Sequence, residues 1–180
     1  MLKPQECVFV VVDIQGTLAN VMEKSESLHQ TVLKLIQGLR LFDIPTLWLE
    51  QLPDKLGKTS PILYEALIET SQPISKQHFS GWNSQEFREQ LINLDRKQII
   101  LVGIETHVCV YQTCRDLLDN DFGVHLVIDA LSSRTTENKQ IGIEMMQARG
   151  ARITNMESLL FELQNKAVGE RFKQLLKLIK

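Results

Sequence analysis

Short apolar runs alternate with longer amphipathic stretches from one end of the chain to the other. The run Cys7–Asp13 is apolar up to its last residue and rich in β-branched side chains, which is typical of a strand buried on both faces. Ser27–Leu41 instead carries its leucine, valine and isoleucine side chains at helical spacing. The same patterns predict further strands at Thr46–Glu50, Gln98–Gly103, Val124–Ile128 and Arg152–Asn155, with a short extended piece at Pro73–Phe79. They predict further helices at Pro61–Glu69, Ser84–Leu94, Thr106–Asn120, Glu137–Ala148, Ser158–Leu163 and Gly169–Lys180.

This alternation predicts the fold class. Four or five strands separated by helices form a doubly wound α/β fold, with a mostly parallel sheet and helices on both faces. A chain of 180 residues with 43% hydrophobic side chains is expected to form one domain, residues 1–180, with a full core. Sites in such sheets lie outside the carboxyl ends of the strands. Asp13, Glu50 and Cys109 all follow expected strands, so we expect them to meet at one edge.

The segment Gly103–Cys109 (GIETHVC) carries the most informative pattern, because it reads as a strand end, a turn and the start of a helix. Cys109 is then expected in the first helical turn, where free N–H groups and the helix dipole favour a thiolate and lower the pKa of the thiol. The alternative is that Cys109 is a small buried apolar residue, a common role for a free cysteine. This segment alone leaves both interpretations open.

Two other charged residues are candidates for catalysis. Asp13 ends an apolar strand, and partial burial there raises the pKa of a carboxylate toward a value that suits a general base. Its alternative role is to cap the following loop through an Asx-turn. Lys76 lies in an extended stretch, and between a carboxylate and a thiol it would hold both as anions. Taken alone, Lys76 is best interpreted as a solvated surface lysine, because nothing in the sequence distinguishes it from the other lysines.

Charge and cysteine content exclude several classes of function. The net charge is −2 with a pI near 6.1, and no block of like charge occurs, which argues against a nucleic-acid partner. The first apolar run is too short to span a membrane and no signal-cleavage pattern follows it, so no membrane partner and a cytoplasmic location are expected. The three cysteines suit free thiols. Cys109 and Cys114 would lie about 7.5 Å apart along one helix, too far to form a disulfide.

A resemblance becomes specific when several segments are taken together in order. Asp13 after its strand, Lys76–Ser80 (KQHFS), Gly103–Cys109 and Asp129–Arg134 (DALSSR) resemble the isochorismatase-like cysteine hydrolase superfamily over nearly the whole chain. Leu49–Gly57 (LEQLPDKLG) resembles the branch of isochorismatase domain-containing proteins. The resemblance implies a Rossmann-like, three-layer α/β fold.

The resemblance also implies a mechanism. Cys109 would be the nucleophile, Asp13 the general base and Lys76 the residue that positions and polarises. The thiolate would attack an amide-like carbonyl and release an amine, and water would then hydrolyse the thioester. A cis peptide bond between Ile104 and Glu105 is implied as well, so that the N–H groups of Glu105 and Cys109 form an oxyanion hole.

The remaining expectations concern the ligands. Loops Gln15–Leu18, Gln51–Lys58 and Phe79–Trp82 are expected to shape the pocket. The candidate substrate-binding residues are Gln15, Gln51, Phe79, Trp82 and His107, although His107 could also simply face solvent. The substrate is expected to be a small molecule.

No metal or other cofactor is expected. Nicotinamidases of the superfamily bind a metal through an Asp-x-His pair and further histidines, whereas only His29 lies between Asp13 and Lys76 here. Isochorismatases cleave a vinyl ether without a cysteine nucleophile, so Cys109 argues against that reaction. The leading interpretation is a cysteine amidohydrolase. Two alternatives remain open: a catalytically idle or ligand-binding scaffold, and a vinyl-ether hydrolase.

A homodimer or larger homo-oligomer is expected from the resemblance and from the apolar stripe of the basic, amphipathic segment Arg171–Lys180. A stripe of this kind could also bind a membrane surface. Packing against the chain's own domain or against a neighbouring subunit is the favoured interpretation.

Overall fold

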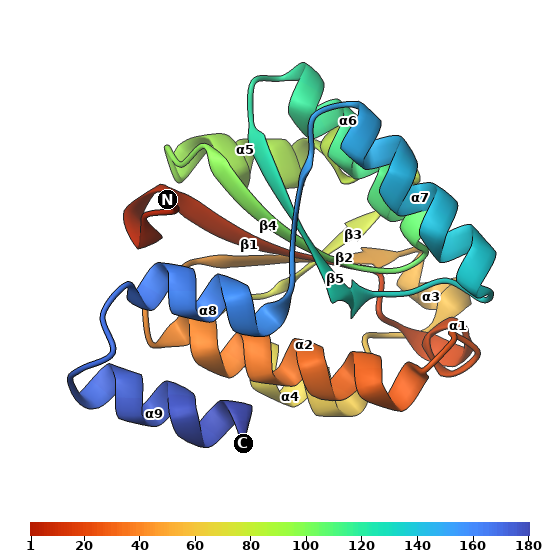
Figure 1. Ribbon diagram of the computed structural model, residues 1–180. Helices are drawn as coiled ribbons and strands as arrows, with labels where there is room; N and C mark the ends of the chain where they lie inside the picture. Colours follow the sequence, from red (N-terminus) through yellow and green to blue (C-terminus); the bar gives the residue numbers. More distant parts are fainter.

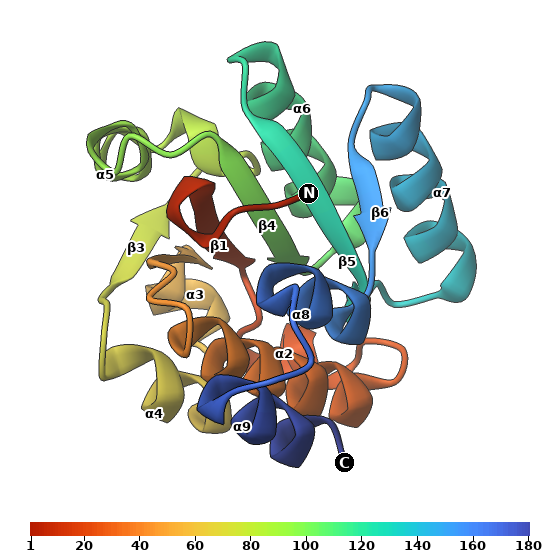
Figure 2. The same ribbon diagram turned by 60° about the vertical axis from the view of Figure 1, so that its left-hand side comes forward.

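The computed structural model describes residues 1–180 and contains one six-stranded parallel sheet in the order β3-β2-β1-β4-β5-β6 (Figures 1 and 2). The doubly wound α/β fold is therefore confirmed. β1 lies in the middle of the sheet and pairs with β2 on one side and β4 on the other. The strands are β1 (Cys7–Val12), β2 (Thr46–Gln51), β3 (Pro73–Lys76), β4 (Gln98–Gly103), β5 (Gly123–Leu131) and β6 (Arg152–Thr154).

Helices cover both faces of the sheet, with α2, α4, α8 and α9 on one face and α5, α6 and α7 on the other (Figure 1). The short helices α1 and α3 follow β1 and β2 at the carboxyl edge of the sheet. The α-helices are α1 (Gly16–Asn20), α2 (Ser25–Arg40), α3 (Pro53–Leu56), α4 (Pro61–Ile68), α5 (Gln85–Asn93), α6 (Tyr111–Asp119), α7 (Thr136–Ala148), α8 (Met156–Gln164) and α9 (Glu170–Ile179). Single turns lie at η1 (Pro4–Glu6), η2 (Gly81–Asn83) and η3 (Thr106–Val110), and η3 is a turn of π-helix.

The side chains of β1 explain why the sheet has two cores. Every residue of β1 is buried, and successive side chains point to opposite faces. Cys7, Phe9 and Val11 pack into the core under α2, α4 and α8, whereas Val8, Val10 and Val12 pack into the core under α5, α6 and α7. A strand with both faces covered must be apolar throughout, which is the pattern in the sequence.

Several predicted elements need correction. The extended piece at residues 73–79 forms a sixth strand, β3, only as far as Lys76, where pairing with β2 ends. The segment Gln51–Lys58 is expected to be a loop, but it contains α3, which starts at Pro53 and ends before Gly57. β5 continues to Leu131, because it pairs again with Gly103 after a shift in register. The helix expected from Thr106 begins instead as the π-turn η3.

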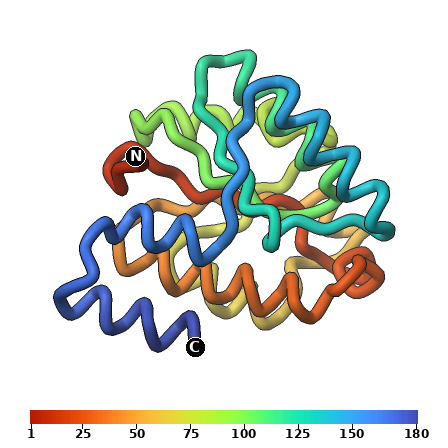
Figure 3. The backbone as a smooth tube through the Cα atoms, in the orientation of Figure 1, coloured from red at the N-terminus to blue at the C-terminus, as the bar shows by residue number.

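The C-terminal helix α9 packs against its own chain. Leu175 is fully buried in the core under α2, and Leu178 packs against the same core. Figures 1 and 3 show α9 lying alongside α2 and α8. The apolar stripe that was expected to support an oligomer is therefore largely covered within the chain. No helix in the structure is both long and apolar enough to cross a membrane.

Candidate active site

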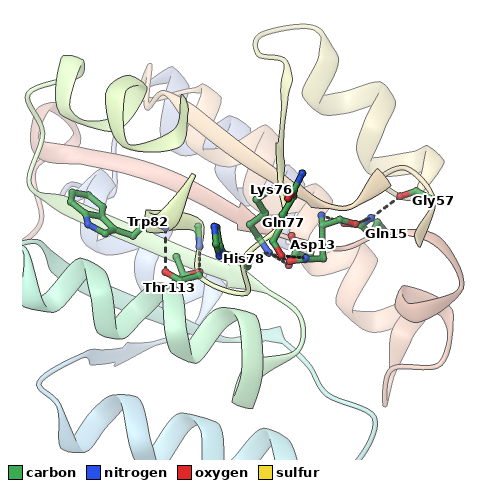
Figure 4. A network of polar contacts seen from close by, with 11 residues as sticks. Asp13, Gln15, Gly57, Lys76, Gln77, His78, Trp82 and Thr113 are labelled. Atoms are coloured by element: carbon green, nitrogen blue, oxygen red, sulfur yellow. Dashed lines mark hydrogen bonds and ion pairs between the residues drawn. The ribbon is translucent and has the colours of Figure 1, made fainter. Parts of the chain in front are cut away.

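Asp13 and Lys76 form a buried ion pair at the carboxyl edge of the sheet. Asp13 follows β1 with a φ of 54°, a left-handed conformation that aspartate tolerates better than most residues. Lys76 is the last residue of β3, and its side chain reaches past the end of β2 to place Nζ 2.6 Å from Oδ2 of Asp13 (Figure 4). The two side chains are 2% exposed or less. The structure thus brings together two residues separated by 63 positions in the sequence.

The ammonium group of Lys76 has three acceptors. Nζ donates to Oδ2 of Asp13 at 2.6 Å, to Oε1 of Gln51 at 2.6 Å and to the carbonyl oxygen of His78 at 3.2 Å. A lysine ammonium has three N–H donors, so all of them are engaged. Lys76 is therefore held as a fixed positive charge beside Asp13, and it has no free donor for a further partner.

The carboxylate of Asp13 has the properties expected of a base. Burial raises the pKa of Asp13 to about 6, and the charge and hydrogen bond of Lys76 oppose that rise. The thiol of Cys109 also interacts with this carboxylate and lowers its pKa. Oδ2 faces Lys76, whereas Oδ1 is buried and has no hydrogen-bond partner. Oδ1 is thus an acceptor that no hydrogen bond of the folded chain occupies, in a site that includes the Cys109 thiol.

Cys109 is buried, and its thiol is not activated in the way that the sequence predicted. Burial raises the pKa of Cys109 to about 12; the negative charge of Asp13 adds to the rise, and Lys76 opposes it. The predicted lowering by a helix N-terminus is therefore wrong. Cys109 lies on the π-turn η3 within a buried core, and desolvation of the thiolate is the largest cause of its raised pKa. Burial and the charge of Asp13 therefore both favour the neutral thiol of Cys109 over the thiolate.

The turn before Cys109 contains the cis peptide bond expected between Ile104 and Glu105. Gly103 has a φ of 128°, and a Cβ at this position would lie 2.1 Å from the carbonyl oxygen of Val12, so only glycine fits where β4 passes β1. The N–H of Ile104 donates to that same oxygen at 2.9 Å. The backbone N–H of Glu105 donates no hydrogen bond within the protein and is free for a ligand.

The loop after β5 supports the start of η3. The hydroxyl of Thr106 donates to the carbonyl oxygen of Ser132 at 2.8 Å, and its backbone N–H is bonded to Ser132 and Ser133. The carboxylate of Glu105 accepts a hydrogen bond from Arg134 Nε at 3.1 Å. These contacts place the segment Asp129–Arg134 against the turn that carries Cys109.

The predicted substrate-binding residues divide into two groups. Gln15 and Gln51 are buried, and their amides are engaged by the protein itself. Trp82 packs its ring edge-on against Phe122, 5.7 Å between centroids, and Figure 4 shows it directed away from Asp13 and Lys76. These three side chains belong to the scaffold in this structure.

The other two candidates remain accessible. Phe79 is 54% exposed in the loop after β3. His107 is half-buried, with Nδ1 3.1 Å from the hydroxyl of Ser133. A cavity of about 370 Å³ borders the ion pair at Lys76 and is lined by polar residues that include Asp54, Gln77 and His78. Asp13 and Cys109 do not line this cavity.

Comparison with known proteins assigns the chain to a family. A family model described as "Isochorismatase domain" matches residues 7–158. The chain belongs to the isochorismatase family. It is 34% identical over 182 residues to the secreted isochorismatase effector Isc1 of Phytophthora sojae, with 99% of this chain and 87% of that protein covered. It is 30% identical over 181 residues to human isochorismatase domain-containing protein 2, covering 98% of this chain and 84% of that protein.

A solved structure agrees with this assignment. The structure of MAR1 ribonuclease from Caenorhabditis elegans superposes with a TM-score of 0.91 at 34% identity, covering 99% of this chain and 91% of that one. The resemblance inferred from the sequence is thus confirmed, and the chain is an isochorismatase-family hydrolase. The structure contains no group of three or more histidine, cysteine, aspartate or glutamate side chains placed to hold a metal ion.

Proposed function

We propose that this isochorismatase-family hydrolase cleaves a small amide-like C–N bond through a thioester on Cys109, without a metal or other cofactor. The observation that carries this proposal is the buried pair of Asp13 and Lys76, which leaves Oδ1 of Asp13 unpartnered in a site shared with the Cys109 thiol. A carboxylate with a pKa of about 6 is ionised at neutral pH, so it can accept the proton of a thiol.

The first half-reaction forms a C–S bond, breaks the C–N bond and moves one proton from the thiol to the leaving amine by way of Asp13. As the sulfur of Cys109 attacks the substrate carbonyl carbon, its proton moves to Oδ1 of Asp13. The carbonyl oxygen becomes negatively charged and receives hydrogen bonds from the N–H groups of Glu105 and Cys109. When the C–N bond breaks, the leaving amine takes the proton from Asp13, and a thioester remains on Cys109.

The second half-reaction reverses these roles with water. Asp13 removes a proton from a water molecule, whose oxygen attacks the thioester carbonyl. The C–S bond then breaks, the acid leaves, and the sulfur regains its proton from Asp13. Throughout the cycle, Lys76 acts as a fixed positive charge, because its donors are already engaged by protein oxygens.

The degree of burial supports a small substrate. Asp13 is 2% exposed, Lys76 3% and Cys109 9%, so little of the site is open to solvent. Small amides, ureas and similar carbonyl compounds fit this access better than a polymer does. The ribonuclease relative raises RNA as a substrate, but the net charge of −2 does not supply the basic surface that RNA binding uses.

A substrate panel with a trapping step tests the proposal. Small amides, ureas and hydroxamates are incubated with the protein, and intact-mass and peptide mass spectrometry follow any acyl group on Cys109. We expect at least one compound to give an adduct that maps to Cys109 and is absent in Cys109→Ala. Matched incubations with isochorismate and with a short RNA serve as competing reactions. Turnover of isochorismate without a Cys109 adduct would favour the vinyl-ether hydrolase, and turnover of RNA without one would favour a nuclease. No turnover of any compound would favour an idle scaffold.

We also propose that the protein is a homo-oligomer in the cytoplasm. The support is the family resemblance, together with the exposed apolar side chains of Leu56 and Phe79 near the carboxyl edge. Helix α9 does not contribute to this argument, because its stripe packs within the chain. Light scattering at micromolar concentration tests the oligomer, and a monomeric mass would contradict it.

A further inference from the structure

Gln51 makes the contacts of a residue that holds the catalytic lysine in place. It is the last residue of β2 and lies directly opposite Lys76 in the pairing of β2 with β3. Its Oε1 accepts a hydrogen bond from Nζ of Lys76 at 2.6 Å, as short as the bond from Lys76 to Asp13. We propose that Gln51 is a positioning residue that fixes Lys76 beside Asp13, and that Gln15 locks Gln51 in turn. This inference rests on the proposed function, in which Lys76 supports Asp13.

Both ends of the Gln51 amide are bonded to the protein itself. Its Nε2 donates to the carbonyl oxygen of Gln77 at 2.9 Å, and the residue is 7% exposed. The orientation of the amide follows from chemistry, because the ammonium of Lys76 has only donors and must face the oxygen of Gln51. One amide thus connects Lys76 to the chain that follows β3.

Gln15 clamps the backbone of Gln51 from the neighbouring loop. Oε1 of Gln15 accepts from the N–H of Gln51 at 2.7 Å, and Nε2 of Gln15 donates to the carbonyl oxygen of Gln51 at 2.9 Å and to that of Gly57 at 2.7 Å (Figure 4). Gln15 is fully buried, so these bonds do not compete with water. Gln15 thereby connects the loop after β1, which carries Asp13, to Gln51 at the end of β2, whose side chain binds Lys76.

Removal of the Gln51 amide should weaken the ion pair through Lys76. Without Oε1 of Gln51, one N–H of Lys76 is left unpaired in a buried site, and the ammonium is held less firmly at Asp13. The carboxylate then loses part of the positive charge that keeps it ionised, so the pKa of Asp13 rises. A substrate-binding glutamine would instead change the affinity for substrate and leave Asp13 unaffected.

The test uses iodoacetamide as a probe of Cys109, with rates measured by peptide mass spectrometry between pH 5 and 9. Wild type is compared with Gln51→Met, which keeps the length of the side chain without its amide, and with Gln77→Met as a matched control. The side chain of Gln77 is exposed, and its only contact with this network is through its carbonyl oxygen. Thermal unfolding of each variant reports on folding, and Asp13→Asn shows whether the rate depends on the base.

We expect Gln51→Met to raise the midpoint of the pH profile by about one unit, which lowers the rate about tenfold at pH 5 and about twofold at pH 7, while Gln77→Met matches wild type. Gln51→Glu restores an oxygen acceptor for Lys76, so its rate at high pH should equal that of wild type. The added carboxylate should still raise the midpoint. If Gln51→Met does not fold, Gln51→Glu carries the test through its midpoint.

The outcomes separate the two proposals. A folded Gln51→Met with the wild-type rate and midpoint overturns the positioning role, as does a wild-type midpoint in Gln51→Glu. When a substrate is known, a rise in KM with an unchanged kcat in Gln51→Met also overturns it. A rate in wild type that does not depend on Asp13 removes the proposed function, and the positioning role with it.

Discussion

Cys109 and Cys114 lie five residues apart on η3 and α6, and they share most of their local properties. Both are buried in the core under α5, α6 and α7, and burial raises the pKa of each thiol to about 12. They differ in their charged neighbours. Cys109 faces the pair of Asp13 and Lys76, whereas the only charge that affects Cys114 is that of Arg149, which lowers its pKa.

The comparison shows that burial and a raised pKa do not distinguish the proposed nucleophile from the other cysteine of the same core. A thiol with a high pKa can still react when a carboxylate beside it accepts the proton during attack. Cys109 has such a carboxylate because η3 directly follows β4, the strand next to β1 and therefore next to Asp13. Cys114 lies five residues further along, on α6, and neither Asp13 nor Lys76 affects the pKa of its thiol.

The largest expected difference between the two cysteines is in turnover. Cys109→Ala and Cys109→Ser should abolish hydrolysis while the protein stays folded, because they change one small side chain. Cys114→Ala should retain hydrolysis, because no reacting group touches that residue. Steady-state rates with a substrate found in the panel, normalised by circular dichroism, measure this contrast. Substantial turnover in Cys109→Ala would show that Cys109 is not the nucleophile.

The next prediction concerns Asp13, the carboxylate that is near Cys109 but not near Cys114. Asp13→Asn keeps the shape of the side chain but cannot accept the proton, so the rate of acylation should fall by about 10²–10⁴-fold. Single-turnover kinetics measure acylation directly. The losses in Asp13→Asn and Cys109→Ala should be far from additive in the double variant, as expected of groups that act together. Additive losses would show that the two residues act independently.

The pH dependence should follow the same carboxylate. The base must be ionised, and the pKa of Asp13 is about 6, so kcat/KM should fall about tenfold per pH unit below that value. In Lys76→Met the positive charge that lowers the pKa of Asp13 is missing, and the acidic limb should move to higher pH. A pH–rate profile for each protein checks this. An unchanged or lower midpoint in Lys76→Met would contradict the role given to Lys76.

The smallest expected effect is on stability. Cys114 is completely buried, so Cys114→Ala leaves a small cavity and should reduce the free energy of unfolding by about 1 kcal/mol. Urea unfolding followed by circular dichroism measures that change. Cys114→Ser serves as a second variant, since it keeps the volume but buries a hydroxyl. A lower kcat in either variant, although the protein is fully folded, would indicate that packing at Cys114 affects the chemistry at Cys109.

Much of the site could be predicted because it depends on strand ends. The continuous apolar run of β1 placed Asp13 at the carboxyl edge, and the apolar run of β4 placed Cys109 there too. Nothing in the residues around Lys76 distinguished it from other lysines, and only the family resemblance selected it.

Other features depend on spatial relations that a pattern does not contain. The contact of Gln51 with Lys76 follows from the register between β2 and β3, and the clamp by Gln15 joins residues 36 positions apart. Without these relations, the sequence predicts Gln15 and Gln51 as substrate-binding residues and does not reveal their bonds to the protein itself. The sequence also predicts a lowered pKa for Cys109, whereas burial raises it. The extent of that burial depends on helices from other parts of the chain. The helices α1 and α3 span only five and four residues, too short to show a period.

The three acceptors around Lys76 also bear on when the protein acquires its chemistry during folding. They come from the ends of β1 and β2 and from the turn after β3, and the bond to Asp13 alone closes a loop of 63 residues. Contacts between distant parts of a chain form late, because the entropy of loop closure must be overcome first. During refolding, the return of activity should therefore lag behind the return of helical signal. Enzymatic activity would then report the completion of the sheet rather than the formation of its parts.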